Sequence, residues 1–234
     1  MVHGVLVLDK PKGWTSAQVV QKIKNKFRFQ KVGHGGTLDP LATGVLPICI
    51  NQATKISSLL LGADKVYEGI FLLGVETDTQ DILGKVIASF PDKALEVAED
   101  QIQAVMKKFT GSLQQVPPMY SAIKKGGRPL YRYARAHQEI ERAARPIHIF
   151  EFKFLGKVGQ EVQFRVHCSK GTYVRTLCAD VGKELGSGAC VKELKRIRTG
   201  NCELRHAIGL EELSLENLTL APHWKTIAEI RPLC

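Results

Sequence analysis

A glycine-rich stretch from Gly33 to Gly44 surrounds a single carboxylate, that of Asp39, and is the part of the chain best suited to chemistry. His34 stands five positions before Asp39, and Pro40 follows it directly. Glycine lets a ligand approach the main chain, and proline biases the residue before it away from helical backbone. Asp, Gly and Pro are also the commonest turn residues. The stretch alone therefore supports a reactive loop and a plain surface turn equally.

Two further segments combine residue types that occur at functional sites. Tyr67 lies in a strand pattern, where a tyrosine usually packs in a core. Arg175 follows a glycine turn and an aromatic residue at the start of a predicted helix, so it is either solvated or paired with a buried carboxylate that it keeps ionised. The seven histidines lack metal-ligand spacing, so no metal site is expected. The chain also lacks a Walker A sequence, so the glycines around Asp39 are not expected to form that phosphate loop.

The chain is strongly basic, with a formal net charge of +10 in 234 residues. Residues 1–60 carry eight Lys and Arg against two acids, and residues 124–145 carry seven against two. The cations of the second block are Lys124, Lys125, Arg128, Arg132, Arg135, Arg142 and Arg145, and the aromatics near them are Tyr120, Tyr131 and Tyr133. Segregated cations neutralise phosphates, and aromatics among them stack on unpaired bases. This pattern favours RNA as the partner.

Cysteine usage and hydropathy indicate the compartment. The six cysteines form no C-x-x-C pair, and the N-terminus has no signal pattern, which is typical of a reduced cytoplasmic setting. Apolar runs such as residues 56–61 are far too short to span a membrane. We therefore expect a folded cytoplasmic protein that has no membrane partner and is a monomer.

Strands and helices alternate along the chain around these residues. Strands are predicted at 5–8, 45–50, 66–75, 85–88, 147–155, 161–167 and 191–198, and helices at about 15–27, 54–61, 99–109 and 173–185. A long irregular basic segment is predicted after the helix at 99–109. Because strands outnumber complete strand–helix–strand units, we expect an α+β fold with a mixed, mainly antiparallel central sheet flanked by helices and loops.

Five segments, in this order, resemble the TruB-type tRNA pseudouridine synthases. They are GVLVLDKPKG from Gly4, VGHGGTLDPLATGVLP from Val32, DKVY from Asp64, VPPMYSA from Val116 and CSKGTYVRTL from Cys168. The match runs in register from residue 4 to about residue 200, and motifs this long are highly specific. The resemblance implies the pseudouridine synthase fold.

The resemblance also implies an isomerase that converts uridine to pseudouridine at position 55 in the T-loop of tRNA. The N1–C1′ bond breaks, the base turns, and C5 joins C1′; substrate and product are isomers, so no cofactor is expected. The uridine must first leave the folded loop by base flipping. Asp39 is implied to be the essential carboxylate, either as a nucleophile at C1′ or as a base toward the sugar. Lys10 and Pro11 are implied to build the wall of the pocket.

Other site residues follow from the same resemblance. Arg175 is implied to supply the charge that compensates the catalytic carboxylate and to restrain its geometry. Tyr67 is implied to stack on the flipped base and is a candidate for proton transfer. His34 is implied to contact the RNA where the base departs, and Tyr173 and Leu194 to line the uridine pocket.

The resemblance further sets the expected boundaries. Residues 1–202 are expected to form the catalytic domain, with an RNA-contacting insertion at about 110–146. Residues 203–234 are expected to be a short tail, without the PUA-type domain that many members carry at the C-terminus. The RNA backbone is then expected to contact Lys124, Lys125, Arg128, Arg132 and Arg135, which would carry a larger share of binding.

Two other functions fit the basic composition. A non-catalytic module that binds or folds tRNA would not require Asp39, Tyr67 and Arg175 together. The catalytic subunit of a guide-RNA-directed complex generally needs the PUA domain to hold its guide. We therefore expect a stand-alone enzyme that acts on the T-arm of tRNA without a guide RNA.

Overall fold

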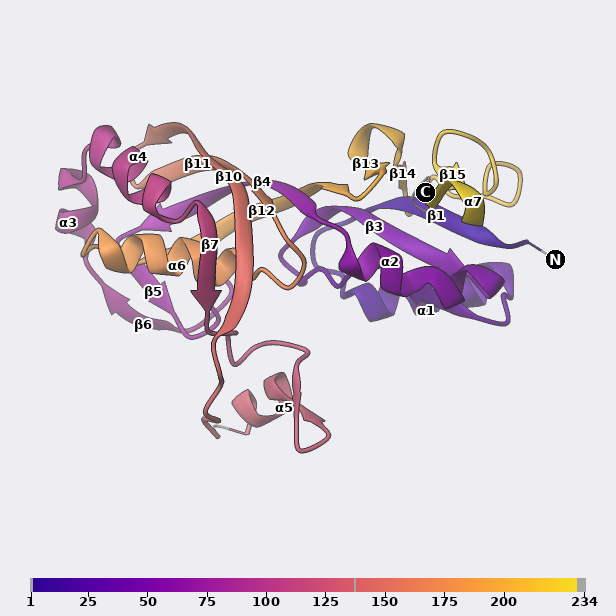
Figure 1. Cartoon of the computed structure of the whole chain (residues 1–234), viewed down its shortest axis with the longest axis horizontal. Helices are drawn as coiled ribbons and strands as arrows, with labels where there is room; N and C mark the ends of the chain where they lie inside the picture. Colours follow the sequence, from indigo (N-terminus) through magenta and orange to yellow (C-terminus); the bar gives the residue numbers. More distant parts are fainter. Residues whose placement is uncertain (1, 137, 231–234) are drawn as a thin grey trace. The chain divides into compact units, whose positions relative to one another are not determined.

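A computed structural model describes residues 2–136 and 138–230 of the chain (Figure 1). The chain divides into two compact units: unit 1 comprises residues 1–68 and 193–234, and unit 2 comprises residues 69–192. It passes between the units within two strands, β4 (Lys65–Leu73) and β12 (Ala189–Thr199). Unit 1 is therefore built from two separate stretches of sequence, whereas unit 2 is continuous.

The elements of unit 1 follow from its strongest apolar patterns. Its further strands are β1 (Gly4–Lys10), β2 (Val32–His34), β3 (Thr43–Ile50), β13 (Cys202–Glu203), β14 (Ile208–Gly209) and β15 (Trp224–Lys225). Its helices are α1 (Ser16–Phe27), η1 (Asn51–Ile56), α2 (Ser57–Gly62), η2 (Leu204–His206) and α7 (Ile227–Ile230). Thr15 caps α1: its hydroxyl accepts from the Gln18 N–H at 3.1 Å, and the Gln18 side chain accepts from the Thr15 N–H at 2.8 Å. This reciprocal capping box fixes where α1 begins.

The segment after β12 completes one edge of the sheet in unit 1. β14 runs parallel to β1 and β15 runs antiparallel to it, on the edge that β3 leaves open. Trp224 packs so closely on Gly4 that a Cβ atom there would overlap the indole ring. Residues 203–230 of the predicted tail are thus a folded part of unit 1. Residues 231–234, with Cys234, lie outside the described residues.

Unit 2 contains a long hairpin and several helices. Its further strands are β5 (Val75–Thr77), β6 (Val86–Ser89), β7 (Gly111–Gln115), β8 (Lys124–Lys125), β9 (Arg128–Pro129), β10 (Arg145–Val158) and β11 (Glu161–Cys168). Its helices are α3 (Pro91–Glu96), α4 (Glu99–Lys108), α5 (Leu130–Ala134) and α6 (Val174–Glu184). The predicted hairpin at 147–155 and 161–167 is confirmed as β10–β11. Phe152 and Phe164, from opposite strands of the hairpin, meet edge to face in the core, with ring centres 5.8 Å apart.

Eleven strands of the described residues form one mixed sheet. Its hydrogen-bonded order is β14-β1-β3-β12-β4-β11-β10-β7, with β2 on β3, β13 on β12 and β15 on β1. The pairs β1–β14 and β3–β12 are parallel, whereas β1–β3, β2–β3, β7–β10 and β10–β11 are antiparallel. The predicted α+β class and the mixed, mainly antiparallel sheet are confirmed.

The predicted irregular segment after residue 109 begins with a strand instead. Residues 111–115 form β7, which pairs with β10 at the end of the sheet order. The segment is mostly polar, so its sequence predicts a strand only weakly. It forms a strand because it pairs with β10. Residues 116–144, here named the basic arm, follow β7. They form the small β8–β9 hairpin and α5, which Figure 1 shows projecting from the sheet of unit 2.

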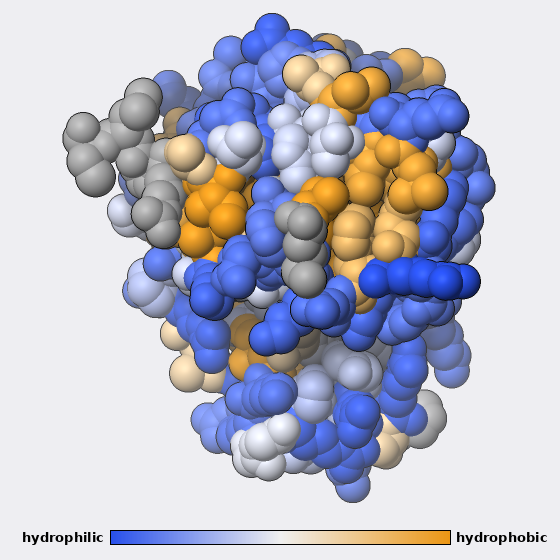
Figure 2. Space-filling model, turned by 90° about the vertical axis from the view of Figure 1, so that its right-hand side faces the viewer, coloured by the Kyte–Doolittle hydropathy of each residue, from blue (hydrophilic) through white to orange (hydrophobic). Residues whose placement is uncertain are grey.

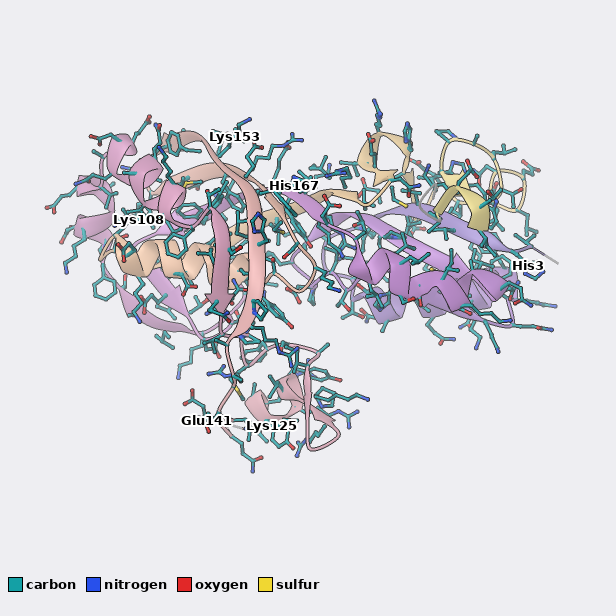
Figure 3. The ribbon with its side chains drawn as sticks, in the orientation of Figure 1. His3, Lys108, Lys125, Glu141, Lys153 and His167 are labelled. Carbon is teal, nitrogen blue, oxygen red and sulfur yellow. The ribbon has the colours of Figure 1, made fainter. Side chains whose placement is uncertain are left out.

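Two features of the surface complete the fold. Figure 2 shows apolar patches enclosed by hydrophilic side chains on the face that it draws. Within residues 2–136 and 138–230, no helix is long and apolar enough to cross a membrane. In the basic arm, the side chain of Lys125 donates to the carbonyl oxygen of Glu141 at 2.7 Å, which joins β8 to the last residues of the arm (Figure 3).

Candidate active site

Asp39 is half-buried in the loop between β2 and β3, and hydrogen bonds fasten the backbone on both sides of it. The hydroxyl of Ser16, at the start of α1, accepts from the Leu38 N–H at 2.9 Å and donates to the Leu38 carbonyl at 3.1 Å. The Pro40 carbonyl accepts from the Gly13 N–H at 2.8 Å. The backbone of the residues before and after Asp39 is therefore held by hydrogen bonds, which fixes the point from which the Asp39 side chain extends.

Two buried cations belong to the surroundings of Asp39. Lys10 has no exposed surface, and its ammonium donates to the carbonyls of Pro11 at 2.9 Å and Trp14 at 2.7 Å. Burial lowers the pKa of Lys10 to about 8; the Asp39 carboxylate opposes this shift and the guanidinium of Arg196 adds to it. Arg196, on β12, is 1% exposed. Two positively charged side chains, Lys10 and Arg196, are therefore buried next to the loop that carries Asp39.

Three other residues predicted for the site also lie in unit 1. His34 ends β2, and burial together with the charge of Arg196 lowers its pKa, which favours the neutral imidazole. Tyr67 on β4 and Leu194 on β12 are both buried. Tyr67 lies in a strand, as its sequence pattern predicts.

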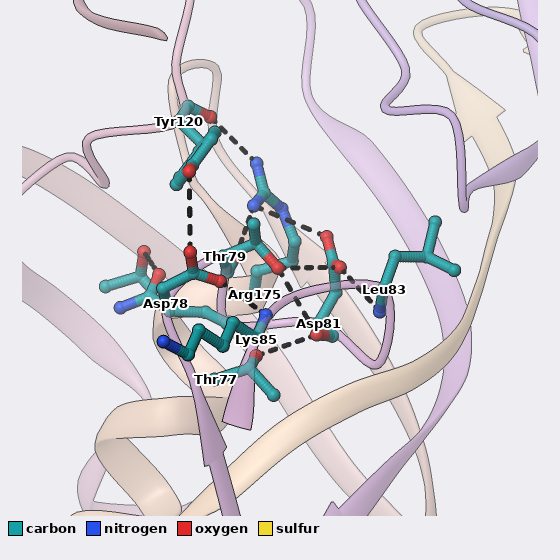
Figure 4. Close-up of polar contacts among 10 residues, drawn as sticks. Thr77, Asp78, Thr79, Asp81, Leu83, Lys85, Tyr120 and Arg175 are labelled. Carbon is teal, nitrogen blue, oxygen red and sulfur yellow. Dashed lines mark hydrogen bonds and ion pairs between the residues drawn. The ribbon is translucent and has the colours of Figure 1, made fainter. Parts of the chain in front are cut away.

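Arg175 and Tyr173 stand at the start of α6 in unit 2. Arg175 is 4% exposed, so the alternative of a solvated arginine is wrong. One terminal nitrogen of its guanidinium lies 3.5 Å from a carboxylate oxygen of Asp81 and donates to the carbonyl of Thr79, and the other donates to the carbonyl of Tyr120 at 3.0 Å (Figure 4). The pairing of Arg175 with Asp39 stays a prediction.

Asp81 is a residue that the sequence reasoning missed. It is 6% exposed in the β5–β6 connection, and its carboxylate accepts from the Thr79 hydroxyl at 2.9 Å and the Leu83 N–H at 3.1 Å (Figure 4). These donors fix the carboxylate that faces Arg175. Two acids, Asp78 and Asp81, flank Thr79 in the sequence, but only the folded turn shows which one is buried beside the arginine.

Gln115 is a second residue that the sequence did not single out. Its buried side-chain amide accepts from the Tyr173 N–H at 2.8 Å and donates to the Tyr173 carbonyl at 3.1 Å. This paired contact joins the end of β7 to the residue before α6. The start of the helix that carries Arg175 is therefore positioned by the strand from which the basic arm leaves.

The cations predicted to contact RNA lie in the basic arm and are exposed; they are Lys124, Lys125, Arg128, Arg132 and Arg135. The guanidinium of Arg128 lies 4.7 Å from the ring centre of Tyr133, and that of Arg135 lies 5.6 Å from the ring centre of Tyr131. Both tyrosines are thus partly covered by the arm's own arginines. These cation–π contacts stabilise the positions of the two arginine side chains.

The potential metal ligands are dispersed in the described ranges, and several cysteines are buried. There, no three His, Cys, Asp or Glu side chains gather closely enough to hold a metal ion. Burial raises the pKa of Cys49 to about 12 and those of Cys190 and Cys202 to about 11. These thiols stay protonated at neutral pH and are poor nucleophiles.

Comparison with known proteins gives consistent matches. Residues 24–174 match the model of the TruB family pseudouridylate synthase N-terminal domain, and residues 175–226 match the tRNA pseudouridylate synthase B C-terminal domain. The chain is 49% identical over 213 residues to tRNA pseudouridine synthase B of Aromatoleum aromaticum, covering 91% of this chain and 68% of the relative. It is 50% identical over 212 residues to that of Aeromonas salmonicida, covering 91% and 66%. The chain spans about two thirds of the length of these relatives.

Solved structures match as well. A chain in the crystal structure of a Cbf5-Nop10-Gar1 complex is 36% identical, with a TM-score of 0.70, over 90% of this chain and 53% of that chain. A chain in the structure of an H/ACA RNP bound to a substrate RNA containing 2′-deoxyuridine is 29% identical, with a TM-score of 0.71, over 97% and 60%. The fold described above is shared with these proteins.

Proposed function

This chain belongs to the TruB family of pseudouridylate synthases, which are isomerases, and on that premise we propose that it converts uridine to pseudouridine at position 55 in the T-loop of tRNA. The pseudouridine synthase fold predicted from the sequence is confirmed by the matches to solved structures. The observation within this chain that carries the proposal is the loop of Asp39. Hydrogen bonds hold its backbone on both sides of the acid, and the buried cations Lys10 and Arg196 lie next to it.

The proposed reaction breaks the N1–C1′ bond and forms a C5–C1′ bond. C5 loses its proton, N1 gains one, and the product is an isomer of the substrate. Asp39 acts either as a nucleophile at C1′ or as a base toward the sugar. Both roles require an ionised carboxylate, and the buried cations Lys10 and Arg196 lie next to the loop that carries it.

The other predicted residues receive roles around the flipped base. Tyr67 stacks on the base, and Tyr173 and Leu194 line its pocket. His34 contacts the RNA where the base departs, and its neutral ring can donate and accept hydrogen bonds there. Arg175 supplies charge that compensates the catalytic carboxylate.

The basic arm is proposed to bind the T-arm of tRNA. Its five exposed cations can neutralise backbone phosphates, and the binding of such a partner is sensitive to salt. The contacts of Arg128 and Arg135 with arm tyrosines order these charges before RNA arrives. Less side-chain entropy is then lost on binding.

Tritium release from C5-labelled uridine in a T-arm transcript tests the proposal. We expect release by the wild-type chain and none by Asp39→Ala. Asp92→Ala removes an exposed carboxylate in the first turn of α3 and should release tritium at the wild-type rate. If the wild-type chain releases none, or if Asp39→Ala releases as much, the enzyme assignment is wrong. Binding of the transcript without release would indicate a non-catalytic tRNA-binding module.

A further inference from the structure

We infer that Arg196 is a positioning residue for Asp39, because its buried guanidinium joins the two ends of the loop that carries the carboxylate. The inference rests on the proposed function, since it concerns the same reaction. Arg196 lies outside the residues that the sequence pattern singled out, and its role follows from the contacts of one side chain.

The side chain of Arg196 reaches backbone carbonyls on both sides of Asp39. Its Nε donates to the carbonyl of Val45 at 2.7 Å, on the far side of the loop. Its terminal nitrogens donate to the carbonyls of Gly36 at 3.0 Å and Thr37 at 3.4 Å, on the near side. The guanidinium is planar and presents its donors in a fixed fork. One rigid group therefore sets the distance between the entry and the exit of the loop.

The backbone of Arg196 fits the same loop closely. Arg196 is the partner of Gly44 in the parallel pairing of β12 with β3. Gly44 has a φ of +95°, and a Cβ atom there would overlap the carbonyl oxygen of Arg196. The Gly44 N–H donates to a carboxylate oxygen of Asp9 at 3.1 Å. The exit of the loop thus has no room to shift unless β12 shifts with it.

Burial of a guanidinium is costly, and that cost indicates a role beyond filling space. Arg196 is among the largest fully buried side chains of the described residues. A buried ionic group is often replaced by apolar residues without loss of stability, so stability alone does not require an arginine here. The loop does require one, because three carbonyls from both of its ends converge on the same place.

Two substitutions separate this role from a general effect on stability. Arg196→Lys keeps a positive charge but lacks the planar fork, and Arg196→Gln removes the charge as well. Pseudouridine formation is measured in single turnovers with enzyme in excess over tRNA, so that the rate constant does not depend on the fraction of enzyme that is folded. We expect the rate constant to fall about 100-fold in both variants, the loss that a displacement of about 1 Å can cause.

The affinity for tRNA distinguishes positioning from binding. Because the Arg196 side chain is buried, we expect the Kd for tRNA to stay within about two-fold of the wild-type value while the single-turnover rate constant falls. Arg198→Gln is the matched control. Arg198 lies on the same strand, and its guanidinium pairs with Asp64 at 2.9 Å and donates to the carbonyl of Gly200. It should retain the wild-type rate constant.

Ser16→Ala keeps the inference testable if the Arg196 variants fail to fold, as judged by circular dichroism. It removes only the hydroxyl that holds Leu38 and should lower the rate constant about ten-fold with the Kd unchanged. Wild-type rate constants in folded Arg196 variants would overturn the inference. So would equal losses in Arg198→Gln, or a wild-type rate in Ser16→Ala where the arginine variants are unfolded. An inactive wild-type chain would instead refute the proposed function.

Discussion

Lys10 is a lysine without exposed surface, a rare position for an ammonium group. Its ammonium donates to the carbonyls of Pro11 and Trp14. The carboxylates of Asp39 and Asp9 raise its pKa and so favour the charged form. Burial nevertheless dominates, and the pKa falls from an ordinary 10.5 to about 8. The native state therefore binds the Lys10 proton more weakly than the unfolded chain does.

This difference predicts how stability depends on pH. Between about pH 8 and pH 10.5 the unfolded chain keeps the proton that the native state has lost, so the free energy of unfolding should rise with pH. The rise contributed by Lys10 is at most about 3 kcal/mol. Lys10→Met should lack it. Urea unfolding of both proteins from pH 7 to pH 10 measures the difference, and a difference that is independent of pH would contradict the prediction.

At the scale of single residues, the sequence predicts candidate residues better than it predicts their partners. The sequence left Arg175 either solvated or paired with a buried carboxylate, and the structure pairs it with Asp81. The sequence could not select Asp81 over Asp78, three positions earlier, because the turn between β5 and β6 decides which carboxylate is buried. Arg196 escaped notice because Lys195 and Arg198 beside it resemble an ordinary basic strand.

At the scale of elements, Gly44 at the start of β3 meets two requirements at once. Gly44 combines a left-handed φ of +95° with close contact to the backbone of β12. A side chain there meets both a conformational penalty and a steric one. The end of the loop and the β3–β12 pairing therefore both require that residue 44 has no side chain.

Gly44→Ala should lower the free energy of unfolding by more than about 2 kcal/mol, because the new Cβ atom overlaps the Arg196 carbonyl. Gly62→Ala is the matched control. Gly62 ends α2, and a Cβ atom there meets nothing within 4 Å, so the change should be neutral or stabilise by up to about 1 kcal/mol. Thermal and urea unfolding of both variants check this. Similar stability changes in the two variants would show that Gly44 has no special role.

Elements with a dense apolar pattern were predictable, and elements that depend on a neighbour were not. The strand at 5–8 and the helix at 15–27 match β1 and α1 because their apolar periods and the Thr15 cap are local signals. β2 and β7 are short and mostly polar. Their order comes from pairing with β3 and β10, and such pairing is a property of the folded sheet.

At the scale of the whole molecule, the net charge of +10 attracts any polyanion, so the contribution of the basic arm must be separated from the general field. The arm carries its cations on a small ordered structure held by cation–π contacts. Charges fixed in this way can contact particular phosphates, whereas dispersed charges contribute mainly to long-range attraction.

The triple variant with Arg128, Arg132 and Arg135 changed to Gln should weaken tRNA binding and reduce its salt dependence. If each arginine neutralises one phosphate, the slope of log K against log salt should fall in magnitude by about 2 to 3. Replacement of Lys93, Lys107 and Lys108 by Gln removes the same charge from α3 and α4 and is the control. An unchanged slope in the arm variant, or an equal change in the control, would show that the arm does not hold the RNA backbone.

The pairing of β1 with strands from both ends of the sequence has a consequence for biosynthesis. In the described residues its outer edge pairs with residues 208–209 and 224–225, which are synthesised about 200 residues after β1, whereas residues 69–192 form a continuous unit. At about 5–20 residues per second, the edge of β1 stays open for on the order of 10 to 40 seconds of translation. An open edge can pair with other chains. The nascent polypeptide is therefore prone to aggregate at β1 until residues 208–209 and 224–225 have been synthesised.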